Sequence, residues 1–258
     1  MKLDIDVAMT YRLGPERTAL LTLEAARTPC QRVLDEQLVI DHARLSVIEG
    51  EWGIGQRRWA RVTGDTLKLR YRAKLSVSRE AVSLQDLTAT PMHGLPSEQL
   101  SFLRPSRYCQ SDRFEGFVER EFGPLSGGAR ITAILDWIAA GMSYDPAYST
   151  CDTTMLDTFA SRKGVCRDYA HLLCGLARAS YIPARFVAAY GAPVDPPDFH
   201  AVVQVWLGGQ WRLIDPTGMC RAEDLVLIAV GRDAADVPFM ETPDEASFVA
   251  QSVRVTAA

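Results

Sequence analysis

Residues 162–171 read Arg-Lys-Gly-Val-Cys-Arg-Asp-Tyr-Ala-His and place Cys166 directly after a glycine turn. An apolar stripe at helical spacing follows, and it predicts a helix over about 166–180. The stripe consists of Tyr169, Leu172, Leu173, Leu176 and Ala177. Cys166 then begins this helix at the edge of its inward face. Because the free N–H groups of a first helical turn favour an anion, this position suits a reactive thiolate.

A hairpin farther along the chain supplies an imidazole and a carboxylate. Gly208-Gly209 is a strong two-residue turn signal, and it predicts a β-hairpin over 199–215. Counting back from the turn places Val202 opposite Asp215, so His200 lies on the same face, diagonal to the aspartate. Diagonal neighbours are about 7–8 Å apart at the backbone, within reach of long side chains. The turn geometry thus predicts a His200–Asp215 pair.

A thiol, an imidazole and a carboxylate are the groups of a cysteine nucleophile site. Cys166 would attack, His200 would move the proton, and Asp215 would orient the imidazole. Each residue alone also has a structural interpretation, since a lone cysteine is usually a small buried hydrophobe and Asp before Pro favours a turn. The presence of all three residues together favours a catalytic role for them. The other histidines (His42, His93 and His171) are interpreted as structural or surface residues, and Asp168 as serving the helix dipole.

Composition limits the classes of function. The chain has 258 residues, of which 47% are hydrophobic and 23% charged, with a net charge of −4, as in a globular protein. No long basic run favours a nucleic-acid groove or an anionic membrane surface, and no apolar run reaches membrane-spanning length. The charged start, Met1-Lys2-Leu3-Asp4, lacks the apolar core of a signal peptide, so we expect a cytoplasmic protein.

The six cysteines are scattered, and no Cys-x-x-Cys pair is present. Reduced thiols are therefore expected, and Cys30, Cys109, Cys151, Cys174 and Cys220 are interpreted as structural. Cys166, Cys220 and His200 could converge on a metal, which leaves metal-assisted hydrolysis as an alternative. The favoured interpretation needs no metal and no organic cofactor.

The periodicity of the sequence divides the chain into four parts. Alternating apolar residues predict half-buried antiparallel strands over 1–82, a β-sandwich-like domain. A connector with several prolines follows over 83–110. Helical periods and then strands predict an α+β catalytic core over 111–240, and the end, 241–258, is expected to be a C-terminal strand or tail.

Several blocks resemble one family. Gly164-Val165-Cys166-Arg167-Asp168-Tyr169-Ala170 is similar to the Gly-Val-Cys-x-Asp-(aromatic)-Ala block of bacterial transglutaminase-like proteins. Ile182-Pro183-Ala184-Arg185, His200-Ala201 and Asp215-Pro216-Thr217 resemble its later blocks in the same order. The resemblance implies a papain-like α+β core with Cys166, His200 and Asp215 as the triad. It also makes Tyr144 a candidate for the second oxyanion donor.

The resemblance and the residues together predict an acyl-transfer enzyme that acts on amide bonds through a thioester. Hydrolysis, as in a peptidase or amidase, is favoured over transamidation because water is always available. The expected partner is a protein or peptide substrate, whereas the oligomeric state stays open. A catalytically inactive binding module with the same fold is the other alternative.

Overall fold

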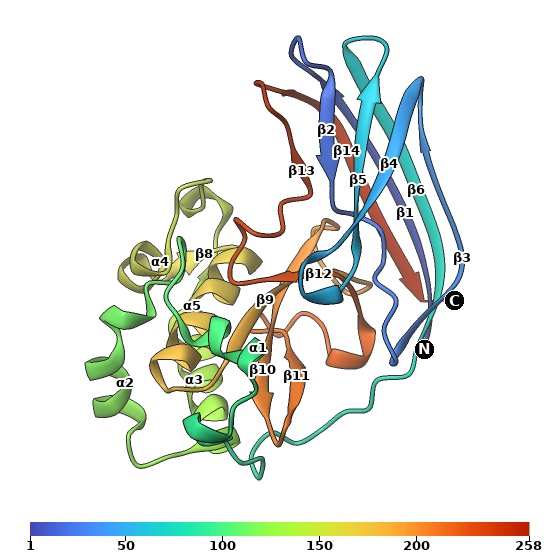
Figure 1. The fold of residues 1–258 in the computed structure, drawn as a ribbon. Coiled ribbons are helices and arrows are strands. Elements are labelled where there is room, and N and C mark those ends of the chain that lie inside the picture. Colours follow the sequence, from blue (N-terminus) through green and yellow to red (C-terminus); the bar gives the residue numbers. More distant parts are fainter. Residues whose placement is uncertain (258) are drawn as a thin grey trace.

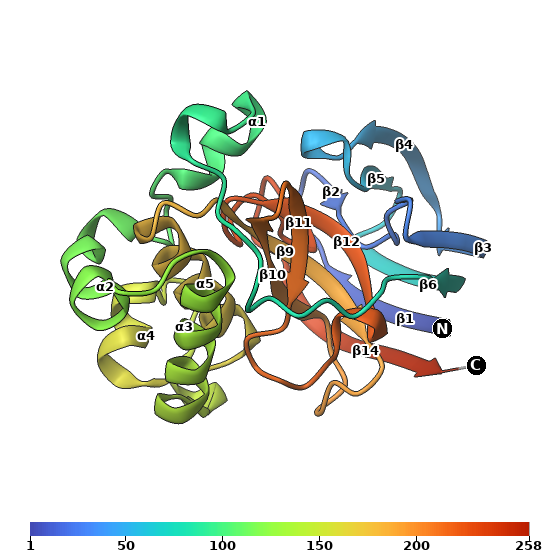
Figure 2. The same ribbon diagram turned by 90° about the horizontal axis from the view of Figure 1, so that it is seen from below.

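The computed structural model describes residues 1–257, and it is a mixed α+β protein, as the sequence predicts. Two four-stranded sheets form a β-sandwich, drawn at the upper right of Figure 1, and the helices gather at the lower left. A third four-stranded sheet lies between them, which is also visible from below in Figure 2. The site residues all lie on the helical side and on this middle sheet.

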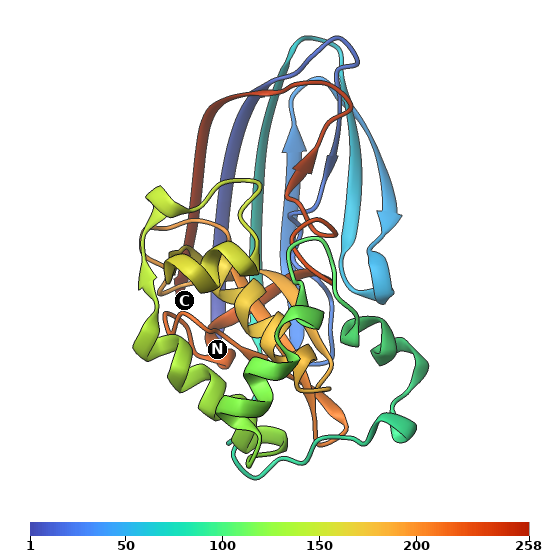
Figure 3. The ribbon, with the colours of Figure 1, turned by 90° about the vertical axis from the view of Figure 1, so that its left-hand side faces the viewer.

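The first sheet of the sandwich has the strand order β14-β1-β6-β3 and is antiparallel throughout. Its strands are β1 (Lys2–Arg12), β3 (Gln31–Ile40), β6 (Thr66–Val77) and β14 (Ser247–Ala257). Strand β14 pairs with β1 from Leu3↔Ala257 to Arg12↔Ser247, and the two run side by side behind the helices in Figure 3. Within the predicted C-terminal segment, Ser247–Ala257 thus contributes an edge strand to the N-terminal sheet.

The second sheet covers the inner face of the first. It has the order β13-β2-β5-β4, with β2 (Thr18–Leu21), β4 (Ala43–Glu49), β5 (Gln56–Val62) and β13 (Met240–Glu241). The alternation of β1 buries Leu3, Ile5, Val7 and Met9 in the core, because successive side chains of a strand point to opposite faces.

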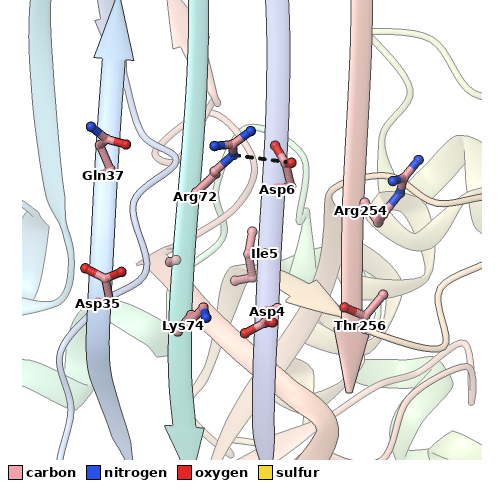
Figure 4. A pocket seen from close by; sticks show the side chains of 10 residues that line it. Asp4, Ile5, Asp6, Asp35, Gln37, Arg72, Lys74, Arg254 and Thr256 are labelled. Atoms are coloured by element: carbon pink, nitrogen blue, oxygen red, sulfur yellow. Dashed lines mark ion pairs between the residues drawn. The ribbon is translucent and has the colours of Figure 1, made fainter. Parts of the chain in front are cut away.

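The outer face of the first sheet is charged. Figure 4 shows this face, where charged and polar side chains surround a shallow hollow of about 350 Å³. They include Asp4 and Asp6 of β1, Asp35 of β3, Arg72 and Lys74 of β6, and Arg254 of β14. The Asp6 carboxylate lies 2.6 Å from Arg70 Nη2 and 3.5 Å from Arg72 Nε, so the charges largely neutralise one another.

The connector packs along the core. It contains η2 (Met92–Gly94), α1 (Ser97–Leu100) and η3 (Ser101–Leu103). Gly128 N–H donates to Leu87 O at 2.7 Å, and Gly208 N–H donates to Thr88 O at 2.9 Å. A Cβ at position 128 would lie 1.5 Å from the Leu84 carbonyl oxygen, so only glycine permits this approach.

The core combines helices with the third sheet. The longer helices are α2 (Glu115–Phe122), α3 (Gly127–Gly141), α4 (Met155–Ser161) and α5 (Cys166–Ala179). The sheet, in the order β11-β10-β9-β12, contains β9 (Ala184–Gly191), β10 (His200–Leu207), β11 (Gln210–Ile214) and β12 (Leu225–Gly231). Helix α5 packs against β9 and β10, which brings the start of the helix to the start of β10.

Short elements complete the chain. They are η1 (Glu51–Gly53), η4 (Ser111–Arg113), η5 (Pro146–Tyr148), η6 (Ala222–Asp224) and the parallel pair β7 (Ser143–Tyr144) and β8 (Lys163–Gly164). Among residues 1–257, no helix has the length and apolar character required to cross a membrane.

Candidate active site

Helix α5 begins at Cys166, as the sequence predicts. The buried carboxylate of Asp168 accepts a hydrogen bond from Val165 N–H at 2.8 Å, which fixes the first turn. Gly164 allows this arrangement, because a Cβ there would lie 2.6 Å from Asp168 Oδ2. The intrahelical bonds start with Asp168 and Tyr169, whose N–H groups donate to Val165 O. The Cys166 N–H precedes them, so it has no carbonyl acceptor within the helix, and it lies near the Tyr144 hydroxyl.

The hairpin register is the predicted one. Leu207 pairs with Gln210 and Trp206 with Trp211, and the register continues to Val203↔Ile214. Gly208 and Gly209 have φ values of 59° and 72°, which the two-residue turn requires and glycine adopts without strain. Continuing this register by one residue places Asp215 opposite Val202. Asp215 is then on the same face of the hairpin as His200, which is two residues from Val202.

His200 and Asp215 form the expected pair. His200 Nε2 lies 2.8 Å from Asp215 Oδ2, and both side chains are buried. Asp215 also accepts hydrogen bonds from Thr217 N–H and Oγ1–H on Oδ1, and from Cys220 N–H on Oδ2. Burial raises the pKa of Asp215, but the hydrogen bonds from His200 and Thr217 outweigh it and lower that pKa below its usual value. The carboxylate is therefore held charged and in one orientation.

Cys166 lies close enough to His200 to influence its titration. His200 Nδ1 has no hydrogen-bond partner within residues 1–257, and Cys166 and His200 line the same cavity. Burial lowers the pKa of His200, but the hydrogen bond to Asp215 and the proximity of Cys166 outweigh it and raise that pKa to about 9. The structure therefore brings a half-buried thiol, an imidazole that favours its charged form and an ionised carboxylate together.

Tyr144 is the fourth residue singled out by the sequence. It ends β7, which pairs with β8 just before Cys166, and its side chain is half-exposed. Burial, and then the nearby Cys166 group, raise the pKa of Tyr144 to about 12. Its hydroxyl therefore stays protonated and able to donate beside Cys166.

His171 has a structural place instead. It is fully buried, and its ring stacks on Tyr108 with a centroid separation of 5.0 Å. Its Nε2 accepts a hydrogen bond from Ala234 N–H at 3.2 Å. Burial, together with Arg167 and Arg178, lowers the pKa of His171 well below its usual value. A neutral imidazole here fastens α5 to the loop after β12.

A metal would have to compete with the hydrogen bonds of the site. His200, Asp215 and Cys220 offer ligand atoms within 4.8 Å of one another, so Asp215 replaces Cys166 in the set that the sequence suggested. However, His200 Nε2 and Asp215 Oδ2 already bond to each other. Burial and the carboxylates of Asp215 and Asp224 raise the pKa of Cys220 to about 12, whereas metals bind the thiolate. The donor set fits an oriented imidazole better than a metal centre.

Three partners of the site were not predicted from the sequence. The N–H groups of Thr217 and Cys220 hold the Asp215 carboxylate, and Arg167 lines the cavity beside the thiol. Asp-Pro-Thr marks a turn, and a turn commonly directs N–H groups toward a preceding carboxylate, so the Thr217 contact could have been inferred. The Cys220 contact depends on the path of the loop that follows.

The family can now be assigned. Residues 117–216 match the model of the transglutaminase-like superfamily. The crystal structure of a candidate cysteine protease from Cytophaga hutchinsonii is similar over 99% of this chain and 90% of that one, with a TM-score of 0.91 and 33% identity. This chain belongs to the transglutaminase-like superfamily. The match extends through the sandwich, so the transglutaminase-like core and the β-domain occur together in both proteins.

Two mycobacterial relatives are similar to part of this chain. An uncharacterized protein of Mycobacterium leprae is 32% identical over 117 residues, which cover 42% of this chain and 41% of the relative. One of Mycobacterium tuberculosis is 30% identical over 116 residues, or 39% and 37% of the two chains. The matches thus span about two fifths of the length of these curated relatives.

Proposed function

We propose that this protein is a cysteine-dependent acyl-transfer enzyme that cleaves amide bonds of a protein or peptide through a thioester. The observation that carries the proposal is the arrangement of His200. One ring nitrogen is fixed by a buried carboxylate at 2.8 Å, the other has no hydrogen-bond partner within residues 1–257, and His200 and Cys166 line the same cavity. A nucleophile, a base within reach of it and a group that orients the base form the machinery of covalent catalysis.

The first step forms the thioester. Cys166 attacks as a thiolate whose proton is already held on His200 Nδ1, and its sulfur bonds to the carbonyl carbon of the amide. When the C–N bond breaks, the imidazolium returns that proton to the departing nitrogen, so that an amine or ammonia leaves. Asp215 accepts the hydrogen bond of Nε2–H throughout, which stabilises the imidazolium and keeps Nδ1 directed at the thiol.

The carbonyl oxygen gains negative charge during this attack. The Cys166 N–H precedes the first intrahelical bond of α5 and is a suitable donor to that oxygen. Tyr144 supplies a second, neutral donor from β7, because its raised pKa keeps the hydroxyl protonated. Donors that are fixed before the reaction stabilise the developing charge without reorganisation.

The second step resolves the thioester. Water, deprotonated by His200, attacks the carbonyl carbon, the C–S bond breaks, and an acid and the free thiol result. An amine in place of water would give transamidation. We propose hydrolysis as the main outcome, since water reaches any site that is open to solvent and an amine must be bound first.

Alkylation with iodoacetamide near pH 7 tests the activation of the thiol. Mass spectrometry of the peptides gives the rate at each cysteine. We expect Cys166 to react at least about tenfold faster than the exposed Cys30 and Cys151, because an imidazole partner favours the thiolate. The variant His200→Ala should bring Cys166 down to their rate, and His93→Ala, at an exposed histidine outside the site, is the matched control.

Equal rates at Cys166, Cys30 and Cys151 would contradict the proposal and favour an inactive binding module. A second assay separates the two outcomes of the thioester: casein is incubated with the protein and a fluorescent primary amine. Release of peptides or ammonia without fluorescence on casein is expected, whereas a faster incorporation of the amine would make transamidation the main reaction. Activity that is lost with a chelator and restored by zinc would favour the metal-assisted alternative.

A further inference from the structure

A cavity of about 580 Å³ adjoins Cys166 and His200, and most of its walls are apolar. The core contributes Phe186, Phe199, Val237 and Phe239, and β1 contributes Met9 and Tyr11. The rings of Phe199 and Phe239 stack with a centroid separation of 3.8 Å, so this wall is a firm aromatic surface. Ligand pockets commonly enclose about 300–1,000 Å³ with predominantly apolar walls, so this cavity has room for a bulky side chain and adjoining parts of a substrate.

The β-domain contributes part of the cavity wall. Met9 and Tyr11 project inward from β1, and Gln251 of the neighbouring strand β14 stands directly beside Met9 in the register. Gln251 Nε2–H2 donates to Asp198 Oδ1 at 2.7 Å, which ties β14 to the loop before His200. The sandwich is therefore part of the wall around the thiol and not only an attached domain.

The charged groups of the cavity have one sign. Arg107 and Arg167 line it near Tyr108, and within residues 1–257 none of its lining residues is an aspartate or glutamate. Arg167 is held by Ser149 Oγ and by Thr150 O, so its guanidinium keeps its place. A cationic group entering this space would lose its water without gaining a partner, whereas an apolar group would gain by burial.

We propose that this cavity binds a bulky apolar side chain of the substrate, within one or two residues of the amide that Cys166 attacks. The inference rests on the proposed function and adds its substrate class: peptides with an aromatic or large aliphatic residue beside the reacting amide. Tyr11 and Met9 make the β-domain a specificity-determining part of the site.

N-substituted chloroacetamides test the cavity without a known substrate. The Cys166 sulfur displaces chloride from the CH2 group, a C–S bond forms, and the N-substituent is left free to enter the cavity. The probes are N-methyl-, N-phenethyl-, N-(3-aminopropyl)- and N-(2-carboxyethyl)chloroacetamide. We expect the phenethyl reagent to alkylate Cys166 roughly 10–100 times faster than the methyl reagent, because burial of a phenyl group is worth that factor. The aminopropyl reagent should be the slowest, and Cys30, which is exposed and outside the cavity lining, should show no such preference.

Two variants test the walls. Ala235→Trp introduces a large ring at an exposed residue of the rim and should reduce the phenethyl-to-methyl ratio at Cys166 by about fivefold or more. Tyr11→Ala removes an aromatic wall of the β-domain and should reduce the same ratio by a few fold. Ala250→Trp, beside Gln251 on β14 but outside the cavity lining, is the matched control and should leave the ratio unchanged.

The outcomes separate the two proposals. A methyl reagent that alkylates Cys166 no faster than Cys30 overturns the proposed function, and the inference falls with it. Rapid methyl alkylation with equal or faster aminopropyl alkylation overturns the apolar pocket alone. A phenethyl preference that Tyr11→Ala leaves intact, in a variant with unchanged circular dichroism and thermal unfolding, overturns the role of the β-domain.

Discussion

Strand β1 borders two hollows of opposite chemistry. Its outward side chains Asp4 and Asp6 belong to the charged hollow of Figure 4, and its inward side chains Met9 and Tyr11 belong to the cavity beside Cys166. In the charged hollow, exposed ion pairs neutralise each other in water, where such pairs contribute little. The cavity has apolar walls and adjoins the buried His200–Asp215 pair, in which the pKa of His200 is raised to about 9. The contrast teaches that convergence of a nucleophile, a base and an apolar space marks a site, whereas the presence of charge alone does not.

The largest expected difference between the two regions concerns activity. Asp215→Asn should lower amide cleavage by roughly 10²–10⁴-fold, since the amide cannot stabilise the imidazolium and favours the wrong tautomer. The matched variant Asp6→Asn removes a carboxylate from the charged hollow and should change the rate less than twofold. The kcat/KM on a peptide substrate measures both, and similar losses in the two variants would erase the distinction.

A pH profile should distinguish the two steps in which His200 acts. The pKa of His200 is raised from 6.5 to about 9, so its charged form prevails at neutral pH and is lost as the pH rises through about 9. Amide cleavage needs the imidazolium to protonate the leaving nitrogen, so kcat/KM should fall above about pH 9. Alkylation by N-methylchloroacetamide needs no such proton and should not fall there.

The comparison of both rates between pH 6 and 10.5 provides the measurement. A fall in amide cleavage centred near 6.5 would mean that Asp215 and Cys166 do not hold the proton on His200. A fall of both rates together above pH 9 would indicate unfolding, which circular dichroism over the same range controls.

The two faces of β1 should also differ in stability. Met9→Ala removes a buried side chain that is 2% exposed and should lower the free energy of unfolding by about 2–5 kcal/mol. Thr10→Ala, one residue along on the outward face, should stay within about 0.5 kcal/mol. Urea denaturation of both variants measures the difference, and a Met9→Ala cost below about 1 kcal/mol would mean that this wall is loosely packed.

The smallest effect is expected in the charged hollow itself. Asp6 accepts two hydrogen bonds from the Arg70 guanidinium, at 2.9 Å and 2.6 Å, but the two side chains are 35% and 52% exposed. Asp6→Ala should therefore lower the free energy of unfolding by only about 0.2–1 kcal/mol, and less in 1 M NaCl because salt screens exposed charges. A larger, salt-independent cost would show that this face is more shielded than its exposure suggests.

Local patterns were sufficient for much of the site. The apolar stripe after Cys166 predicted the helix and its first residue, and both are confirmed. Gly208-Gly209 predicted the hairpin register and, through it, the pairing of His200 with Asp215, which the structure shows at 2.8 Å. These predictions succeed because a two-residue turn and a helical period act over a few residues, so they leave little freedom to the chain between them.

Other parts of the site depend on contacts between distant segments. Strand β14 completes the sheet of β1 and brings Gln251 beside Met9. The sequence of neither strand predicts which strand it pairs with. The N–H groups that hold Asp215 come from a loop whose path the surrounding core decides.

The sequence by itself determined the α+β class, the start of α5, the hairpin and the three residues proposed for catalysis, because periodicity and turn chemistry are local. Only the tertiary structure decided that Cys166 and His200 line a shared apolar cavity and that Met9 and Tyr11 also line it. The physical reason is that strands alternating in polarity can bury their apolar faces against many partners. Which partner they meet is settled only when the whole core packs.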